Sequence, residues 1–407
     1  MRILQINKFF YRRGGSESYF FDLIKLLEER GHEVVHFSMK HRRNQYSPYS
    51  EFFVDEINFE EREGFFGDCK KFFHSLYSSE AKEKLEQLIL KTKPEVAHLH
   101  NISHHLSPSI LTVLKKHKIP IIQTLHDYQL MCPNFKMFTE GAVCERCKKY
   151  RYWNACLHKC IHDSRLEGLA GAFEMYFHRA CQIYENSVYC FVTPSDFLKE
   201  KIRAWKAGGK AKISAISHFI ETSAYEPAYA PGDYTLYFGR LSKEKGLDIL
   251  LRAVAGSNIR LKIVGDGPEK GKLKVESEKL KVNVEFVGHK SGEELHGLIR
   301  GAKFVVLPAI WFENYPMSLL EAGALGKAMI GANLGGIREI IRDGENGLLA
   351  APGNAKDLRE KMERLWNDGA LCERMGRKAR EMVAEINSPE EHYKKIIDLY
   401  EMSKKNN

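Results

Sequence analysis

The first half of the chain alternates short apolar runs with stretches in which apolar residues recur every three or four positions. Short apolar runs are typical of buried strands, and the helical spacing over 17–29 predicts an amphipathic helix. The strand-like runs lie at 3–6, 34–38, 96–100, 119–124, 188–193 and 212–217. This alternation predicts a parallel sheet with helices on both faces.

The alternation pauses once and then restarts. Residues 223–233 contain two prolines and a glycine but few aliphatic side chains, as expected for a linker. Strand-like runs return at 235–238, 259–264, 284–287, 304–307 and 328–330. We therefore expect an α/β protein with two doubly wound Rossmann-like domains, over 1–220 and 221–387, and an amphipathic helix near 389–402.

Two acids, Glu313 and Glu321, lie eight positions apart in an otherwise apolar stretch. The first follows the strand-like run 304–307, and Pro316 is well placed to open a helix that contains the second. An acid in the loop and another in the first helical turns can converge on one ligand above the strand. Open parallel sheets bind ligands at that end of their strands.

A turn with two cations follows the first strand of the second domain. Gly239 permits a tight turn beside a ligand, and Arg240 and Lys245 are both available to an anion. A planar guanidinium and a point-charge ammonium suit a diphosphate. The alternative is a surface loop with ordinary charges.

Three further glycine turns follow predicted strands, at Gly14–Gly15, Gly265–Gly267 and Gly335–Gly336. Each could be an ordinary turn. Their shared position after strands favours one common cleft that binds an anion. None matches the GxGxxG fingerprint, so a nicotinamide cofactor is poorly supported.

Composition narrows the class of protein. Hydrophobic content of 43% and charged content of 28% are typical of a globular domain, and no apolar run is long enough to span a membrane. The first residues lack the apolar core of a signal peptide, so we expect a cytoplasmic protein. The net charge of +9 is concentrated at 136–159 and 199–212. This basic surface is either a solvated face or a docking site for an anionic membrane or substrate; no nucleic-acid motif accompanies it.

Five cysteines crowd into an insert-like stretch at about 130–165. Cys144 and Cys147 form a C-x-x-C pair, and Cys156 and Cys160 follow at C-x-x-x-C spacing. Four such thiolates can close a structural zinc site, with Cys132 as a substitute ligand. Reduced, partly buried thiols or disulfides are the alternatives.

These motifs, taken together, resemble the family-4 retaining glycosyltransferases with the GT-B fold. The matching segments run in family order: 14–17, 124–128, 238–246, 264–268, 313–321 and 335–339. The resemblance implies two Rossmann-like domains facing across a cleft, the first completed by the C-terminal helix 388–407. The cysteine-rich insert after His126-Asp127-Tyr128 resembles that of a subset of the family.

The resemblance also implies roles for individual residues. Arg240 and Lys245 would neutralise the donor diphosphate, Glu321 would bind the ribose, and Glu313 and His126 would lie by the transferred sugar. The remaining donor-binding positions implied are Gly15, Gly239, Gly265, Asn314, Tyr315, Pro316, Met317 and Ser318.

The expected function is transfer of a sugar from a nucleotide-diphosphate donor, with UDP favoured, to a glycan or lipid-linked acceptor in cell-surface polysaccharide or glycolipid synthesis. The chain contains no Asp-x-Asp motif, so no catalytic cofactor is expected. Another GT-B enzyme, such as an epimerase, and a non-catalytic binder of nucleotide sugars or nucleic acid are the alternatives. Aromatic residues in 44–80 and 169–183 either fill the first domain's core or form an apolar groove for a lipid at the inner face of a membrane.

Overall fold

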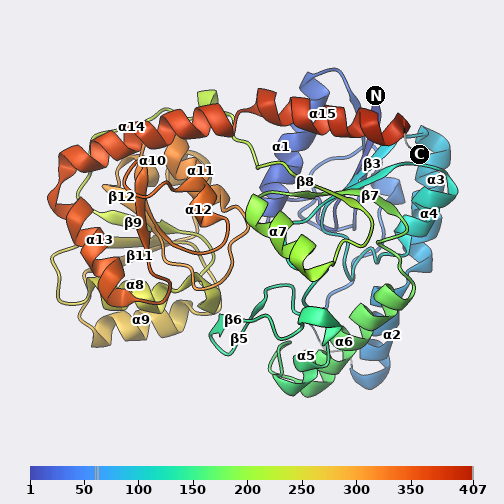
Figure 1. Cartoon of the computed structure of the whole chain (residues 1–407), viewed down its shortest axis with the longest axis horizontal. Helices are drawn as coiled ribbons and strands as arrows, with labels where there is room; N and C mark the ends of the chain where they lie inside the picture. The colour runs from blue at the N-terminus through green and yellow to red at the C-terminus, as the bar shows by residue number, and fades with distance from the viewer. Residues whose placement is uncertain (60, 62–63, 406–407) are drawn as a thin grey trace. The chain divides into compact units, whose positions relative to one another are not determined.

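The computed structural model describes residues 1–59, 61 and 64–405, and divides into two compact units (Figure 1). Unit 1 comprises Met1–Met137, Cys144–Ser217 and His392–Asn407, and unit 2 comprises Phe138–Val143 and His218–Glu391. The main division falls three residues before the predicted boundary. Residues 138–143, which the sequence places in the insert of the first domain, group with unit 2 instead.

Unit 1 is built on a six-stranded, all-parallel sheet. In spatial order its strands are β2 (Glu33–Phe37), β1 (Arg2–Ile6), β3 (Val96–Leu99), β4 (Ile121–Thr124), β7 (Val188–Thr193) and β8 (Lys212–Ala215). The central strands are buried on both faces, which is why they read as unbroken apolar runs.

The helices of unit 1 lie around this sheet and at one end of the unit. They are α1 (Gly15–Glu29), α2 (Gly64–Leu76), α3 (Ser79–Thr92), α4 (Ile110–Lys116), α5 (Asn154–Leu157), α6 (Arg165–Ala180), α7 (Asp196–Trp205) and most of α15 (Pro389–Lys405), with 3-10 turns η1 (Ser50–Phe52) and η2 (Lys148–Tyr150). The helix predicted at 17–29 is confirmed and begins two residues earlier. The last helix ends at Lys405, and residues 406–407 of the prediction lie outside the described part of the chain.

Unit 2 repeats the plan with a second six-stranded parallel sheet. Its strands, in spatial order, are β11 (Val284–Gly288), β10 (Leu261–Val264), β9 (Thr235–Phe238), β12 (Phe304–Leu307), β13 (Ala328–Ala332) and β14 (Gly347–Ala350). Its helices are α8 (Leu247–Val254), α9 (Lys270–Lys279), α10 (Gly292–Arg300), α11 (Met317–Ala324), α12 (Ile337–Ile340), α13 (Ala355–Asn367) and α14 (Gly369–Ile386), with 3-10 turns η3 (Thr222–Ala224) and η4 (Lys243–Lys245). Two parallel-sheet α/β domains were predicted, and the structure confirms them.

Three short strands were not predicted. Strand β14 is four residues long, and its first residue, Gly347, lies so close to β13 that an added Cβ would sit 2.2 Å from the Met329 carbonyl oxygen. The antiparallel pair β5 (Phe138–Thr139) and β6 (Ala142–Val143) has two residues a strand, too few to show alternation.

In both sheets the strand order reverses next to the first strand of the unit: β1 lies between β2 and β3, and β9 between β10 and β12. Loops that leave neighbouring strands at such a point run in opposite directions and open a crevice, where ligands bind in folds of this class.

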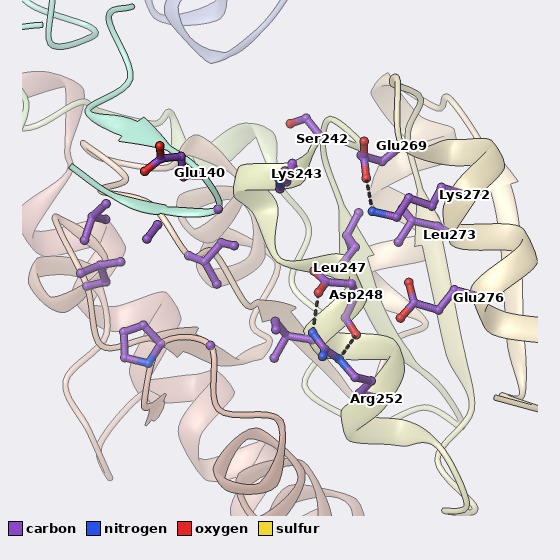
Figure 2. Close-up of a pocket in the computed structure, with 18 residues that line it drawn as sticks. Glu140, Ser242, Lys243, Leu247, Asp248, Arg252, Glu269, Lys272, Leu273 and Glu276 are labelled. Atoms are coloured by element: carbon purple, nitrogen blue, oxygen red, sulfur yellow. Dashed lines mark hydrogen bonds and ion pairs between the residues drawn. The ribbon is translucent and has the colours of Figure 1, made fainter. Parts of the chain in front are cut away.

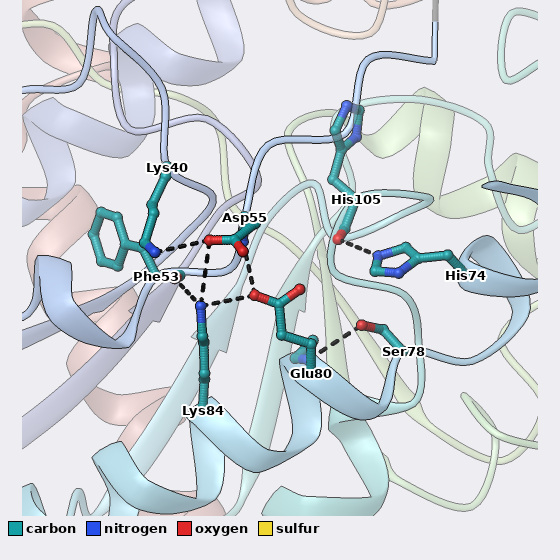
Figure 3. Close-up of polar contacts among 9 residues, drawn as sticks. Lys40, Phe53, Asp55, His74, Ser78, Glu80, Lys84 and His105 are labelled. Atoms are coloured by element: carbon teal, nitrogen blue, oxygen red, sulfur yellow. Dashed lines mark hydrogen bonds and ion pairs between the residues drawn. The ribbon is translucent and has the colours of Figure 1, made fainter. Parts of the chain in front are cut away.

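Polar contacts anchor the irregular segments of unit 1 (Figure 3). The Lys84 ammonium binds both the Glu80 carboxylate at 2.7 Å and the Phe53 carbonyl oxygen at 2.9 Å. His74 Nε2 donates to the His105 carbonyl oxygen at 3.0 Å, which ties the end of α2 to the loop after β3. In the part of the chain that the structure describes, no helix has both the length and the apolar composition needed to cross a bilayer.

Candidate active site

The candidate residues of unit 2 gather at one edge of its sheet. Arg240, Gly265, Glu313 and Gly335 lie in the loops that follow β9, β10, β12 and β13. These four strands are parallel neighbours, so their carboxyl ends meet at the same edge. The structure therefore brings together turns that span almost 100 positions of the sequence.

Backbone hydrogen bonds join the turn after β9 to the turn after β10. Gly239 N–H donates to the Val264 carbonyl at 3.0 Å, and Leu241 N–H donates to the Asp266 carbonyl at 2.9 Å. Gly265 has a φ of +135°, and a Cβ there would lie 2.0 Å from the Gly239 oxygen. Only glycine fits such a contact, so these turns form one rigid support.

Glu313 is the centre of the site. The residue is only 5% exposed, and Oε1 accepts from Lys245 Nζ at 2.5 Å and from Trp311 Nε1 at 2.8 Å. The Glu313 carbonyl accepts from Gly336 N–H at 2.7 Å. A carboxylate held by an ammonium and an indole has a single orientation, and the pairing compensates the cost of its burial.

The two cations differ in freedom. Lys245 Nζ is fixed on Glu313 and lies 5.4 Å from the centre of the Trp311 ring. The Arg240 side chain is exposed, and among the described residues it forms no ion pair. The Arg240 carbonyl accepts from the Tyr237 hydroxyl at 2.8 Å, and burial raises the pKa of Tyr237 well above its usual value, so this tyrosine is a neutral donor. Arg240 thus has a fixed backbone and an available guanidinium.

The segment after Glu313 leads into α11. Pro316 was predicted to open the helix, but it is the capping residue, with an extended ψ of 115°, and the helix begins at Met317. Tyr315 is buried, and its hydroxyl accepts from Asn387 Nδ2 at 2.9 Å. Asn314, Ser318 and Glu321 are half-buried. The predicted donor-binding residues 314–318 therefore lie just before α11 and in its first turn, and Glu321 lies in its second turn.

The unit 1 candidates lie at the corresponding edge of the other sheet. Gly15 is the first residue of α1, directly after the loop that leaves β1, and His126 follows β4. The buried Glu17 carboxyl accepts from the Ser16 hydroxyl at 3.0 Å, and burial raises its pKa. Burial also lowers the pKa of Lys8 and raises that of Asp127. Sequence reasoning missed Lys8, because a single lysine after a strand carries no recognisable signal.

His126 belongs to a chain of hydrogen-bonded imidazoles. His126 Nε2 and His100 Nδ1 are 3.0 Å apart, and His100 Nε2 lies 2.9 Å from Gln5 Oε1. Because the Gln5 oxygen accepts from His100 Nε2–H, a neutral His100 accepts the Nε2–H of His126 through Nδ1. Burial lowers the pKa of His126 to about 3, so the ring is uncharged at neutral pH.

A third histidine, His98, extends this cluster to the C-terminal helix. His98 Nδ1 lies 2.6 Å from the Tyr400 hydroxyl, and its Nε2 lies 2.7 Å from Thr124 Oγ1. Burial lowers the pKa of His98 to about 3. The His-x-His pattern on a buried strand was the one sequence signal that could have identified His98 and His100.

The cysteines are thiols in this structure, and the Cys132 and Cys147 thiols are hydrogen-bonded. That bond lowers the pKa of Cys132. Among the described residues, no three or more His, Cys, Asp or Glu side chains are arranged to hold a metal ion. The zinc site at Cys144, Cys147, Cys156 and Cys160 therefore stays a prediction.

A separate cavity of about 820 Å³ lies within unit 2, between the β5–β6 hairpin, η4, α8 and α9 (Figure 2). Two ion pairs line it: Arg252 with Asp248 at 2.5 Å, and Lys272 with Glu269 at 3.4 Å. Lys243 lines this cavity, whereas Lys245, two residues later in η4, pairs with Glu313. The internal pairing distinguishes the cavity from the site around Glu313, where Arg240 is available.

His218 is the first residue of the main segment of unit 2. Its ring meets the Tyr315 ring edge-on at 6.1 Å, and its carbonyl accepts from Asn387 Nδ2 at 2.7 Å. These contacts are those of a packing residue at the start of unit 2.

Comparison with known proteins identifies the family. The model described as Glycosyltransferase Family 4 matches residues 13–224, which is more than half of the chain. The model described as Glycosyl transferases group 1 matches residues 221–382. The two matches adjoin near the division between the units.

Relatives and solved structures agree with the glycosyltransferase matches. An uncharacterized glycosyltransferase of Methanocaldococcus jannaschii is 36% identical over 38% of this chain and 45% of its own length, so the chain spans less than half of that relative. An uncharacterized protein in the cps region of Klebsiella pneumoniae is 25% identical over 84% of this chain and 88% of its own. Among solved structures, sucrose-phosphate synthase from Thermosynechococcus elongatus has a TM-score of 0.75 at 19% identity and covers 98% of both chains. Anabaena HepE, in complex with UDP and glucose, has a TM-score of 0.68 at 17% identity over 99% of this chain and all of its own.

The structural likeness confirms the expected GT-B fold, whereas membership of a cysteine-rich subset is untested. From the match over 13–224, the chain belongs to glycosyltransferase family 4.

Proposed function

We propose that this glycosyltransferase is a retaining enzyme that transfers a sugar from a UDP-sugar to a glycan or lipid-linked acceptor in cell-surface polysaccharide or glycolipid synthesis. The observation that carries the proposal is the Lys245–Glu313–Trp311 cluster beside Arg240, at the point where the unit 2 strand order reverses. A structural neighbour, Anabaena HepE, was solved with UDP-glucose, which supports a nucleotide-sugar donor of this kind.

The two cations suit the departing diphosphate. When the bond between the sugar's anomeric carbon and the phosphate oxygen breaks, negative charge grows on that oxygen. Preorganised donors aimed at such charge lower the barrier most when they need not move during the reaction. Lys245 is already fixed, and Arg240 supplies a planar pair of donors for phosphate oxygens. Under this proposal these cations perform the neutralisation without a catalytic metal.

The carboxylates have separate tasks. Glu313, which is buried and ion-paired, would stabilise an oxocarbenium-like sugar by its negative charge. Glu321, in the second turn of α11, would accept hydrogen bonds from the ribose hydroxyls. Gly15 and the neutral His126 of unit 1 are assigned to the same donor, Gly15 through its backbone and His126 by hydrogen bonding to a sugar hydroxyl.

Retention follows if the acceptor attacks on the face from which the diphosphate leaves. The acceptor oxygen forms the new bond to the anomeric carbon as the phosphate bond breaks, and its proton passes to the departing phosphate oxygen. Glu313 then acts by charge and forms no bond to the sugar. A covalent sugar–enzyme adduct on Glu313, found by mass spectrometry of the intact protein, would contradict this step.

The experiment that tests the function has two stages. Nucleotide sugars with different bases are first screened by thermal shift, because a ligand that binds only the folded protein raises its melting temperature. UDP-sugars should give the largest shift, and Glu321→Ala should reduce it. Released nucleotide is then measured with and without acceptor glycans or glycolipids.

Nucleotide release that requires an acceptor supports transfer. Conversion of the donor sugar without acceptor would favour an epimerase instead, and binding without any turnover would favour a sensor. An unchanged shift for Glu321→Ala would remove the assignment of the ribose site.

A further inference from the structure

Helix α6 exposes an apolar stripe to solvent. Leu166, Leu169, Phe173 and Phe177 recur at helical spacing along the 16-residue helix. Leu166 is 79% exposed and Phe173 is 52% exposed. Isolated exposed apolar residues are ordinary, but a continuous stripe indicates a surface that is covered in the working protein.

The opposite face of the same helix is already occupied. Gly168 packs so closely on α5 that an added Cβ would lie 2.3 Å from the Ala155 carbonyl oxygen. Ala172 and His178 are also buried. These contacts hold α6 in the fold from the opposite face, so most of the outward stripe stays exposed to solvent.

Neighbouring helices add to the stripe. The Phe72 and Phe173 rings are 5.8 Å apart, which places α2 against α6, and Phe73 and Tyr77 beside Phe72 are exposed. The α5 side contributes exposed Trp153 and Leu157. Helices α2, α5 and α6 lie together at one end of unit 1 (Figure 1). We call the exposed apolar side chains of these helices and of the residues directly flanking them the apolar face.

Cations accompany the apolar face. The segment 136–159, which includes α5, contains six lysines and arginines and two glutamates. The six cations are all exposed. They are Lys136, Arg146, Lys148, Lys149, Arg151 and Lys159. Arg165 on α6 and Lys70 on α2 are exposed as well.

We propose that the apolar face is a membrane-docking surface for an anionic lipid bilayer. Leucine and phenylalanine side chains would enter the boundary between headgroups and acyl chains, and the exposed tryptophan would lie at the headgroup level, where indole is favoured. The cations would contact anionic headgroups. A second copy of the chain fits less well, because like-charged segments beside both apolar faces would repel.

The consequence for the reaction rests on the proposed function: an enzyme docked in this way takes its acceptor from the membrane, so the acceptor is lipid-linked. Docking itself needs no donor and is measured separately. Failure to bind vesicles and failure to bind nucleotide sugars are therefore distinguishable results.

The test is co-sedimentation of the full chain with phosphatidylcholine vesicles, with and without phosphatidylglycerol. Wild-type protein should sediment with the anionic vesicles. Leu169→Glu combined with Phe173→Glu should lower the partition coefficient by about tenfold or more, since charge replaces inserted apolar area. Lys148→Glu combined with Arg151→Glu should weaken binding to anionic vesicles only. Leu90→Glu is the matched control, because Leu90 is a 62% exposed leucine on α3, outside the apolar face, and it should change nothing.

All variants alter exposed side chains, so circular dichroism should confirm that each one folds. Wild-type protein that ignores anionic vesicles would overturn the proposal. So would a Leu169/Phe173 variant that binds them as well as wild type. A wild-type dimer that ignores vesicles and becomes monomeric in that variant would show instead that the face joins two copies.

Discussion

The two sheet edges that carry the candidate residues solve different chemical problems. At the unit 2 edge, a buried carboxylate is paired with an ammonium, and an exposed guanidinium extends from a glycine turn. At the unit 1 edge, buried imidazoles share hydrogen bonds, and burial keeps His98 and His126 uncharged. Charges suit a diphosphate and neutral hydrogen-bonding groups suit a sugar. Under the proposed function, the same α/β plan would carry two kinds of recognition.

The largest expected effect comes from removing Lys245, the cation that is paired with Glu313. Lys245→Ala should lower kcat/KM by roughly 10²–10³, because a fixed charge near the leaving group is lost. It should also lower the melting temperature, since Glu313 would keep its burial without its ammonium partner. Steady-state kinetics well below the melting temperature separate the two effects.

Lys243→Ala is the matched control for that variant. Lys243 lies in the same 3-10 turn but lines the separate cavity (Figure 2), so its loss should leave activity within about twofold. Equal losses in both variants would mean that the charge of the loop, rather than the Lys245–Glu313 pair, matters.

The close contact between the two turns at the unit 2 edge is tested by adding a methyl group at Gly265. Gly265→Ala places a methyl group 2.0 Å from the Gly239 oxygen, and we expect a loss of about 3 kcal/mol in the free energy of unfolding. Gly256→Ala is the comparison, because Gly256 also has a positive φ, +70°, but nothing lies within 4 Å of its added Cβ. Its cost should be only about 1 kcal/mol. Equal costs in urea unfolding would show that backbone strain, not the close approach of two turns, explains the glycine.

The stability that depends on the uncharged, buried His98 of unit 1 should decrease in acid. The unfolded chain takes up protons on histidine near its ordinary pKa of about 6.5, whereas folded His98 does so only at about 3. Stability is therefore fully present above pH 6.5 and is lost as the pH falls toward 3. From pH 7 to pH 5, His98 alone should account for roughly 2 kcal/mol.

His98→Gln should remove that part of the pH dependence of urea unfolding. His289→Gln, at an exposed position of unit 2, should not change it. An unchanged slope in the His98 variant would mean that this imidazole is protonated in the folded state.

Much of the fold could be predicted from local patterns. Strands such as β9 and β12 are buried on both faces and read as uninterrupted apolar runs, so their positions were predicted to the residue. Strand β14 was missed because it begins with Gly347 and leaves only three apolar residues of the strand after it, and the two-residue strands of the β5–β6 hairpin are too short to establish a period. Residues 138–143 group with unit 2, whereas the sequence places them in the insert of the first domain, since chain order alone does not show which unit a short hairpin contacts.

The site could be predicted only in part. Glycine turns and charged residues after strands marked Arg240, Lys245 and Glu313, because parallel strands bring their ends together. The pairing of Lys245 with Glu313 joins residues 68 positions apart, and the His98–Tyr400 hydrogen bond joins residues 302 positions apart. No local pattern encodes such pairs, so they depend on how the strands and the last helix assemble.

Trp311 gives the unit 2 edge an optical reporter of its own. Its indole N–H is bonded to Glu313, and the Lys245 ammonium lies 5.4 Å from its ring centre. Tryptophan emission shifts when nearby charges move, so a bound diphosphate that draws on Lys245 would change the colour and intensity of this fluorophore. The chain holds four tryptophans, and replacing the other three with phenylalanine would leave a single emitting side chain with which to follow donor binding in real time.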